Sequence, residues 1–439
     1  MNPRRVALVL LCAALGAGAQ SGEDRVFEWG FEQRVRNENW NNATDWTDQS
    51  DDQRVQVRYR TRMWLDGPVT SNIDFHVGLN QETNQILTPD RPAQFDEVFF
   101  ETAYLDFKKL FVDGLSLKVG RQNVMKGEGF VLLEGDSGDG SRSIFSNAAV
   151  LGYTWKKSKV ELIGILNPYT ERFLPKIHNR HRQLTEWDEQ AVGTYYTDNN
   201  LKNTTLEAYY FYKKETGDRR APTNAQYQPD RHIHTAGGRA VRDLGRGWSL
   251  RSEFALQWGA EHPNVEIRGW GGYGYARKSF SRDRQYVQAG YWGMSGDDPK
   301  TTGRVEAWDP LFSRWPKWSE LYIYSQSREV GASYWTNTSM WHAEWGYSPW
   351  KRVQSRVTYY WMKSFHPFQG SSATFGSGKV RGSLPEVRVD VALNKNWKGH
   401  VVYEHLAPGS FYSTRAHAYF LRFEMIYTIG GKFAVGHDN

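Results

Sequence analysis

Apolar and polar side chains alternate with a period of two along much of this chain, and that period restricts the fold more than any other feature. In residues 54–65, Val55, Val57 and Tyr59 begin one apolar face, while four arginines and Gln56 occupy the opposite face. A strand places alternate residues on opposite faces, whereas a helix would scatter these arginines around its axis. The segment is therefore predicted to be a β-strand with one apolar and one charged face.

The same alternation recurs along the chain in segments of about 9–12 residues, a length that crosses a bilayer when the strand is tilted. About 18 such strands are expected. They lie near residues 26–36, 54–65, 73–82, 97–108, 115–122, 149–156, 159–167, 189–197, 203–213, 231–242, 248–259, 267–278, 284–295, 337–347, 352–362, 384–394, 398–407 and 416–429.

The connections between these strands alternate between long and short. Segments such as 37–53, 123–148 and 296–336 are long, whereas 157–158 and 348–351 are short. Long extracellular loops and short periplasmic turns alternate in this way in outer-membrane barrels. The pattern predicts an all-β fold, a transmembrane antiparallel up-and-down β-barrel. A secreted β-sandwich or β-solenoid also alternates, but sandwich strands are shorter and a solenoid has a fixed repeat.

The N-terminus predicts export. Arg4 and Arg5 precede an apolar run at residues 6–15, which is too short to span a bilayer, and a small-residue cleavage site ends at Ala19. Residues 1–19 are therefore expected to be a cleaved signal peptide and residues 20–439 a single outer-membrane barrel domain. Cys12, the one cysteine, would leave with the signal.

Composition agrees with a barrel. Aromatic residues make up 15% of the chain although hydrophobic residues make up only 39%. Girdles of Trp and Tyr at the two membrane surfaces raise aromatic content without raising mean hydropathy. The formal net charge of +6 is too small to indicate nucleic-acid binding, and export argues against it as well.

Several short motifs occur in a characteristic order. They are Gly120-Arg121-Gln122, the Gly-rich run 134–142, the run 290–299, Trp308–Phe312, Tyr403-Glu404, Gly409–Tyr412 and residues 418–424. Together they resemble the alginate export porin family from about residue 26 to 430. The resemblance implies an 18-stranded, monomeric barrel whose narrow lumen is lined by arginines and lysines with a few acids. In the best-known member such a barrel conducts a polyuronate outward, whereas other members move other solutes.

Two features depart from the family pattern. The chain ends at Phe433–Asn439 without the terminal aromatic that barrel assembly prefers, and the strand at 337–347 contains Trp341 and Trp345. Because of these two departures, the resemblance does not identify the substrate.

Arginines are the main functional candidates, because guanidinium groups keep their charge and bind carboxylates bidentately. In the predicted strands, most of these arginines occupy the alternate positions that face the lumen. Arg121 and Arg142 belong instead to the family motifs. The candidates for the lumenal substrate path are Arg34, Arg54, Arg58, Arg60, Arg62, Arg121, Arg142, Arg251, Arg356, Arg388 and Arg422. Their expected lumenal acid partners are Glu32, Glu253, Asp390 and Glu424. A wall of cross-strand ion pairs that only stiffens the barrel is the competing interpretation of any single arginine.

The sequence gives little support for a metal site, a phosphate-binding loop or a catalytic serine. Asp297 and Asp298 are candidates for a calcium site, but a turn before Pro299 explains them better. His232 and His234 share a strand face, and His178 and His181 lie in a loop, yet no third ligand stands at metal-binding spacing. The run 135–142 lacks the ending of a phosphate-binding loop, and the sequence has no Gly-x-Ser-x-Gly. No cofactor and no enzymatic activity are expected.

The sequence therefore predicts a channel in the bacterial outer membrane for a polar, anionic solute such as an alginate-like polyuronate or another saccharide, which would pass by diffusion. The alternative is a barrel without transport function, such as an adhesin, a receptor or a plugged structural barrel. Expected partners are the lipid bilayer, lipopolysaccharide, the barrel-assembly machinery and the anionic saccharide itself. The sequence leaves open whether the long segment 296–336 covers the pore.

Overall fold

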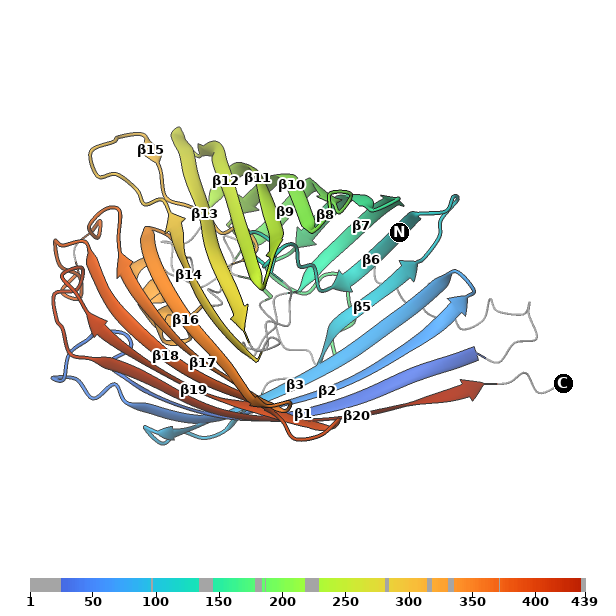
Figure 1. Cartoon of the computed structure of the whole chain (residues 1–439), viewed down its shortest axis with the longest axis horizontal. Coiled ribbons are helices and arrows are strands. Elements are labelled where there is room, and N and C mark those ends of the chain that lie inside the picture. The colour runs from blue at the N-terminus through green and yellow to red at the C-terminus, as the bar shows by residue number, and fades with distance from the viewer. Residues whose placement is uncertain are drawn as a thin grey trace.

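The strands form one closed sheet, as the alternating pattern predicted (Figure 1). The computed structural model describes residues 25–95, 98–133, 145–177, 184–185, 187–217, 229–280, 284–313, 318–330, 335–370 and 372–435. The expected signal peptide at 1–19, the candidate Arg142, and both His178 and His181 lie outside the described residues.

The strands follow one another along the chain. In the first half they are β1 (Arg25–Asn41), β2 (Arg54–Thr70), β3 (Ile73–Thr88), β4 (Gln94–Phe95), β5 (Phe99–Phe107), β6 (Leu115–Gln122), β7 (Ser146–Trp155), β8 (Ser158–Asn167), β9 (Asp188–Asp198) and β10 (Thr204–Thr216). In the second half they are β11 (Asp230–Gly245), β12 (Trp248–Glu261), β13 (Val265–Phe280), β14 (Gln285–Met294), β15 (Arg304–Val305), β16 (Thr338–Trp350), β17 (Val353–Lys363), β18 (Val380–Ala392), β19 (Trp397–Pro408) and β20 (Ala418–Val435).

Eighteen of these strands make the barrel, because β4 and β15 are two-residue additions. Each barrel strand pairs antiparallel with its neighbour in the sequence, and β1 closes the ring by pairing with β20 from Arg25↔Val435 to Asn41↔Tyr419. An even number of antiparallel strands brings both ends of the barrel to the side of the short turns. The fold class is thus confirmed: a closed, 18-stranded, antiparallel β-barrel.

Several strand ends differ from the prediction, and two of the differences shorten expected loops. β1 extends to Asn41 and β3 to Thr88, so parts of the expected loops 37–53 and 83–96 are strand. The connection between β12 and β13 spans only residues 262–264 on the side of the long loops. The long–short alternation is therefore interrupted there, although strand direction continues to alternate.

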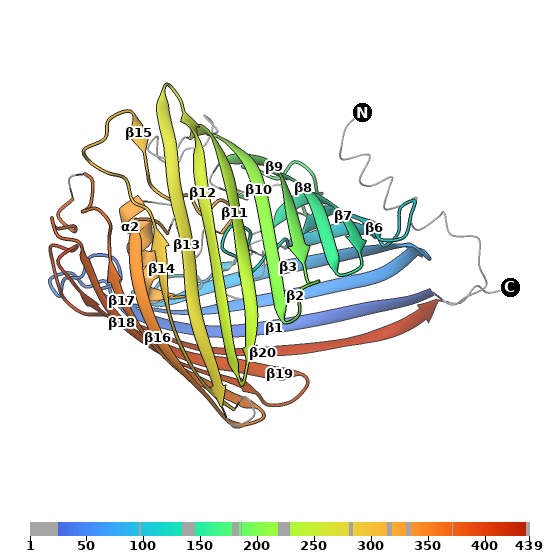
Figure 2. The ribbon, with the colours of Figure 1, turned by 45° about the horizontal axis from the view of Figure 1, so that its top comes forward.

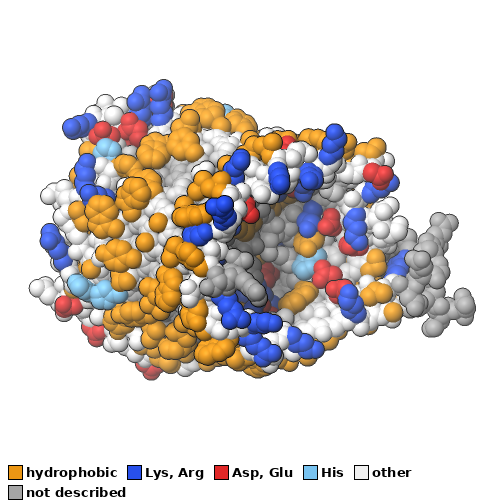
Figure 3. Space-filling view, in the orientation of Figure 1, with side chains coloured by type: hydrophobic (Ala, Val, Ile, Leu, Met, Phe, Trp, Pro, Cys, Tyr) orange, Lys and Arg blue, Asp and Glu red, His pale blue; other side chains and the backbone are white. Residues whose placement is uncertain are grey.

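The two faces of the wall have opposite chemistry. Large apolar side chains such as Met63, Phe254 and Trp341 are half exposed on the outer face, whereas charged side chains such as Arg34 and Glu38 are buried inside. The space-filling view shows apolar side chains over much of the outside and Lys and Arg around an opening (Figure 3). This inside-out distribution is typical of a barrel whose solvent is lipid.

The barrel also contains a ten-residue helix, α2 (Leu321–Val330). It lies within the outline of the ring, next to β19 and β20 (Figure 2). Among the residues that the structure describes, no helix is long and apolar enough to cross a membrane.

Candidate functional site: the barrel lumen

Two segments of the chain fold into the barrel and narrow its lumen. The first is residues 123–133, which follow β6, and the second is the described part of the connection from β15 to β16, residues 307–313, 318–330 and 335–337. Their apolar side chains belong to two buried clusters that also contain inward-facing residues of the wall. The lumen is thus partly filled by the chain's own loops.

Phe130 anchors the first segment. Its ring stacks on Trp308 with a centroid distance of 5.0 Å and meets Tyr273 and Trp335 edge-on at 5.6 and 5.5 Å. Trp308 and Trp335 come from the second segment, so the two inward segments pack on each other as well as on β13. Aromatic pairs at these distances add to the free energy gained by burying the rings.

Glu128 fixes the same segment electrostatically. Its carboxylate accepts hydrogen bonds from Arg251 Nη1 at 3.0 Å and from Tyr275 Oη at 2.8 Å, and it lies 3.3 Å from Arg239 Nη2. Arg239 also binds Glu207 at 2.6 Å. One loop carboxylate therefore holds two wall arginines, and Arg251 stays partly exposed beside it.

The second segment is held by charged residues of the wall. Glu404 on β19 accepts hydrogen bonds from the backbone N–H groups of Glu320 and Leu321, at the N-terminus of α2. Arg422 on β20 contacts Glu320 at 2.8 Å, and Arg381 on β18 binds Glu329 near the other end of the helix at 2.7 Å. Both ends of α2 are therefore tied to the barrel.

A further network joins Asp309 of the second segment to the wall. Asp309 contacts Arg231 at 2.7 Å, and Arg231 in turn contacts Glu215 at 2.5 Å. Lys213 lies 2.6 Å from Glu215 and donates a hydrogen bond to the Leu311 carbonyl. Burial raises the pKa of the Asp309 carboxyl, so its contact with Arg231 is what favours the charged form.

A ladder of arginines and glutamates covers the inner face of β20, β1, β2, β3 and β5. Arg60 contacts Glu32 at 2.8 Å, Arg62 contacts Glu101 at 2.5 Å, and Arg36 contacts Glu424 at 2.5 Å. Register explains these pairs, because cross-strand neighbours such as Glu32 and Arg62 share one face of the sheet. The ladder residues are the arginines Arg34, Arg36, Arg54, Arg58, Arg60, Arg62 and Arg422 and the acids Glu32, Glu38, Glu82, Glu101 and Glu424.

Comparison with known proteins settles the family. The family model for alginate export matches residues 26–423. The chain belongs to the alginate export family. A search of curated proteins found no match to the sequence.

Solved structures share the fold of this family member at low sequence identity. Acinetobacter baumannii OccAB4 has a TM-score of 0.59 at 11% identity, covering 94% of this chain and 100% of that one. Pseudomonas aeruginosa OpdQ has a TM-score of 0.57 at 12% identity over 92% and 98% of the two chains. Pseudomonas aeruginosa OprD has a TM-score of 0.55 at 11% identity over 92% and 95%. Family and fold together support an outer-membrane channel.

The structure places the candidate arginines of this family member in different surroundings. Arg34, Arg60, Arg62 and Arg422 are buried among acids, while Arg58 retains a partly exposed side chain 3.5 Å from Glu38. The more exposed candidates inside the barrel are Arg54, Arg251, Arg356 and Arg388. Arg356 lies 3.3 Å from Glu386, Arg388 lies 2.8 Å from Asp390, and the Arg54 guanidinium lies 5.5 Å from the Trp40 ring centroid.

Arg121 is held in place by an acid and by two hydrogen-bond acceptors. Its guanidinium lies 2.7 Å from Glu171 and donates hydrogen bonds to the Phe100 carbonyl and to Asn147 Oδ1, each at 3.0 Å. Among the four acid candidates, Glu32, Asp390 and Glu424 contact arginines. Glu253 instead accepts hydrogen bonds from Tyr209 and Tyr273 at 3.0 and 2.9 Å.

The metal candidates serve as turn residues. Asp298 accepts a hydrogen bond from the Lys300 N–H at 3.0 Å, and Asp297 accepts one from the Glu306 N–H at 3.0 Å. His232 and His234 lie on the outer face of β11, opposite to the inward Ile233. Within the described residues, no group of three or more His, Cys, Asp or Glu side chains is arranged to hold a metal ion.

Sequence reasoning missed several residues of the lumen. Arg36 has the same inward parity as Arg34 and could have been named from the sequence, whereas Glu38 lay in a region expected to be a loop. Glu128 lies on an inward segment, and Glu404 and Arg381 lie on barrel strands but contact α2. No strand pattern reveals these contacts.

Proposed function

We propose that this protein is an outer-membrane channel for a polar, negatively charged solute of the saccharide class. The path would run past the arginines that keep part of their side chain exposed inside the barrel. A guanidinium that stays charged and partly hydrated can exchange a carboxylate of the solute for water, which allows weak and successive binding. The solute is expected to pass through the channel without being chemically changed.

The accessible arginines carry this proposal. The side chains of Arg251 and Arg356 are 38% and 35% exposed, whereas those of Arg34 and Arg36 are almost completely buried. A buried arginine that touches two carboxylates is already neutralised and cannot be replaced without leaving an acid unpaired. The solute-facing charge is therefore expected to come from a few arginines rather than from the whole ladder.

The charge balance also limits the strength of selectivity. The seven ladder arginines meet five wall glutamates, and Glu320 of the inward segment adds a sixth carboxylate. The excess of arginines over carboxylates in the ladder is therefore small. We therefore expect moderate anion selectivity that weakens as salt screens the charges.

Reversal potentials in planar bilayers test the proposal. Replacing Arg54, Arg251 and Arg356 with glutamine should move the reversal potential in a salt gradient toward the value for cations. Arg242→Gln is the matched control, because Arg242 lies on the outer face of β11. A wild-type pore that is cation-selective, or a triple variant that matches wild type, would contradict the proposed path.

A second candidate function is a plugged barrel that does not transport. The two inward segments and their buried aromatic clusters favour it, because they occupy part of the lumen. The same bilayer recordings distinguish the two: a folded barrel that stays silent at all voltages would support the plugged alternative.

A further inference from the structure

A pocket is hollowed in the lumenal wall beside two periplasmic turns, the ones that join β16 to β17 and β18 to β19. Its volume is about 480 Å³, which is in the range of small-molecule sites. Lumen-facing residues of β17 to β20 line most of it. Gln354, Asp390, His400 and Glu424 are successive cross-strand partners, and they form the edge of the pocket away from the turns. The pocket therefore lies at the periplasmic mouth of the lumen.

The small side chain of Ala392 leaves this hollow. Ala392 faces the lumen between Arg352, whose carbonyl accepts its N–H at 2.9 Å, and Lys398, its register partner on β19. Arg352 also donates a hydrogen bond to the Leu393 carbonyl at 2.7 Å, which ties the two turns together. Two long cationic side chains thus border a space that the methyl group of Ala392 does not fill.

Cations outnumber acids in the lining of this pocket. The charged residues among the described lining are the cations Lys351, Arg352, Arg388 and Lys398 and the acids Asp390 and Glu424. Asp390 lies 2.8 Å from Arg388. Glu424 lies 2.5 Å from Arg36 and 3.3 Å from His400. Glu386, two residues before Arg388, contacts Arg356 at 3.3 Å. Because each acid already has a cationic partner, a net positive charge remains in the pocket and attracts anions.

Lys398 is the cation that stays available. Its register partners are Ala392 on β18 and Ile426 on β20, so neither neighbouring strand places an acid directly beside it. Its side chain is exposed, and among the described residues no carboxylate lies within ion-pair distance of its ammonium group. An ammonium without an acid partner can bind a carboxylate of the solute without first breaking an ion pair.

A second pocket of the lumenal wall has the same volume but the opposite charge. It measures about 480 Å³ and is lined from β1, β2, β3, β5 and β6. Its described lining contains two cations, Arg62 and Lys118, and three carboxylates, those of Glu32, Asp66 and Glu101. Arg62 lies 2.5 Å from Glu101, and Lys118 lies 3.5 Å from Asp106. Charge, rather than size, therefore distinguishes the pocket beside Lys398.

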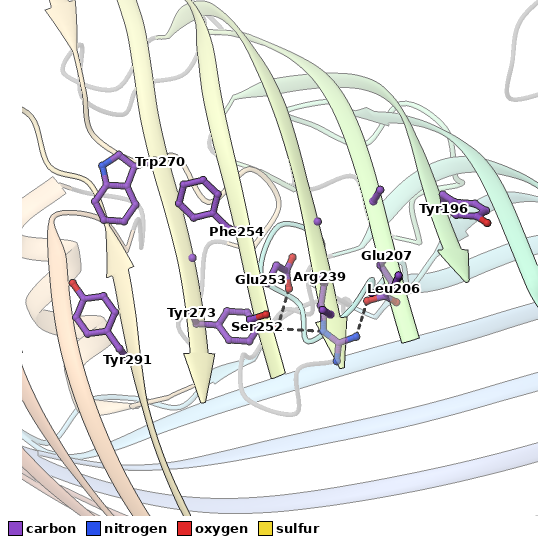
Figure 4. A pocket seen from close by; sticks show the side chains of 14 residues that line it. Tyr196, Leu206, Glu207, Arg239, Ser252, Glu253, Phe254, Trp270, Tyr273 and Tyr291 are labelled. Carbon is purple, nitrogen blue, oxygen red and sulfur yellow. Dashed lines mark hydrogen bonds and ion pairs between the residues drawn. The ribbon is translucent and has the colours of Figure 1, made fainter. Parts of the chain in front are cut away.

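A larger hollow also lacks an available cation. It measures about 710 Å³ and crosses β9 to β14. Arg239 is the one cation in its described lining, and Figure 4 shows the contacts of this guanidinium with Glu207 and Tyr273. Arg239 Nη1 donates to Glu207 at 2.6 Å, and its Nε donates to the Tyr273 hydroxyl at 3.3 Å. Of these three pockets, the one beside Lys398 combines space with an unpaired cation.

Gln354 adds a neutral polar group to the same pocket. Its side chain is exposed and lies in the row of Asp390 and His400. A side-chain amide both donates and accepts hydrogen bonds, so it suits hydroxyl groups, whereas an ammonium only donates. A sugar acid presents a carboxylate and hydroxyl groups together, which is the combination that Lys398 and Gln354 match.

We propose that this pocket binds one sugar-acid unit of the solute at the periplasmic mouth, with its carboxylate on Lys398 and a hydroxyl group on Gln354. The choice of a saccharide rests on the proposed function. The site itself is additional, because Arg54, Arg251 and Arg356, which carry that proposal, are not among the described residues that line the pocket.

Isothermal titration calorimetry of the full-length barrel in neutral detergent at low salt tests the site with galacturonate, galactose and acetate. Galactose lacks the carboxylate and acetate lacks the hydroxyl groups, so galacturonate should bind at least ten-fold more tightly than either. Lys398→Gln should weaken galacturonate binding about ten-fold, because a charge-assisted hydrogen bond is lost. Gln354→Leu should remove most of the advantage of galacturonate over acetate.

Lys395→Gln is the matched control. It removes the same charge from an exposed position three residues away, in the turn between β18 and β19, but Lys395 does not line the pocket. It should change the affinity for galacturonate less than two-fold, and gel mobility with and without heating verifies that each variant is a folded barrel. Equal weakening by Lys398→Gln and Lys395→Gln would overturn the proposal, since the attraction would then be diffuse.

A wild-type barrel that binds acetate as tightly as galacturonate would overturn the proposal as well. The channel function is tested separately by the reversal potentials. An anion-selective channel that does not bind galacturonate would refute the pocket alone. A silent barrel that shows the expected binding pattern would refute the channel and still support the pocket.

Discussion

Glu404 on β19 and Leu321 at the start of α2 are joined by a hydrogen bond of 2.9 Å from the Leu321 N–H to the carboxylate. The same carboxylate accepts the N–H of Glu320 at 2.8 Å and the hydroxyl of Ser319. Ser319 Oγ in turn accepts the Tyr322 N–H at 3.0 Å. A residue of the barrel wall thus caps a helix in the lumen, and a negative charge at a helix N-terminus is favourable.

Replacing this cap should release the helix without unfolding the barrel. Glu404→Leu keeps the volume but leaves two buried N–H groups unpaired, at a cost of about 2 kcal/mol. Hydrogen exchange of the amides at 320–322 should become roughly 30-fold faster. Unchanged exchange would show that packing alone holds α2, and exchange in β1 or β20 serves as the internal control.

Removing the Phe130 ring should loosen the first inward segment. Phe130→Ala deletes an aromatic side chain buried among Trp308, Trp335 and Tyr273, and such deletions cost about 3–5 kcal/mol. We expect larger and noisier single-channel conductance. The control Phe111→Ala removes a ring that is 85% exposed in a periplasmic turn, and it should leave conductance unchanged. Identical traces from both variants would argue that residues 123–133 do not restrict the pore.

Neutralising Glu128 should make the pore more selective for anions. Glu128→Gln leaves Arg239 and Arg251 with less compensating charge. One unit charge at about 10 Å in water is worth about 0.4 kcal/mol for an anion and the opposite amount for a cation, so the anion-to-cation permeability ratio should rise roughly four-fold. Glu28→Gln, at the exposed end of β1 beside Lys432, should not change it. A fall in anion preference would contradict the prediction.

Adding a methyl group at Gly30 should destabilise the wall. A Cβ there would lie 2.0 Å from the Trp64 ring, which covers Gly30 from the neighbouring strand. Gly30→Ala is expected to cost about 1–3 kcal/mol, because overpacking forces the ring from its position. The urea midpoint of the refolded barrel measures the effect. Gly164→Ala is the matched control, since nothing lies within 4 Å of the added atom, and equal midpoints for both would refute the steric argument.

The arginine column illustrates how far the sequence reaches. Period-two alternation correctly put Arg58, Arg60 and Arg62 on one face of β2, because the side-chain direction of a strand is a local property. The alternation did not identify the acids that these arginines contact. Glu101 comes from β5, beyond the next long strand, and its contact with Arg62 depends on sheet register and on a bulge near Leu79.

The sequence by itself determined the barrel. Its alternation, strand lengths and connections dictate the number of strands, their antiparallel order and the chemistry of the two faces, because each of these follows from local geometry and from lipid as the outer solvent. Only the tertiary structure decided what fills the lumen. Phe130, Glu128 and α2 lie inside because their segments find apolar and charged partners on strands that are distant in sequence. Local strand geometry does not specify which distant residues come together.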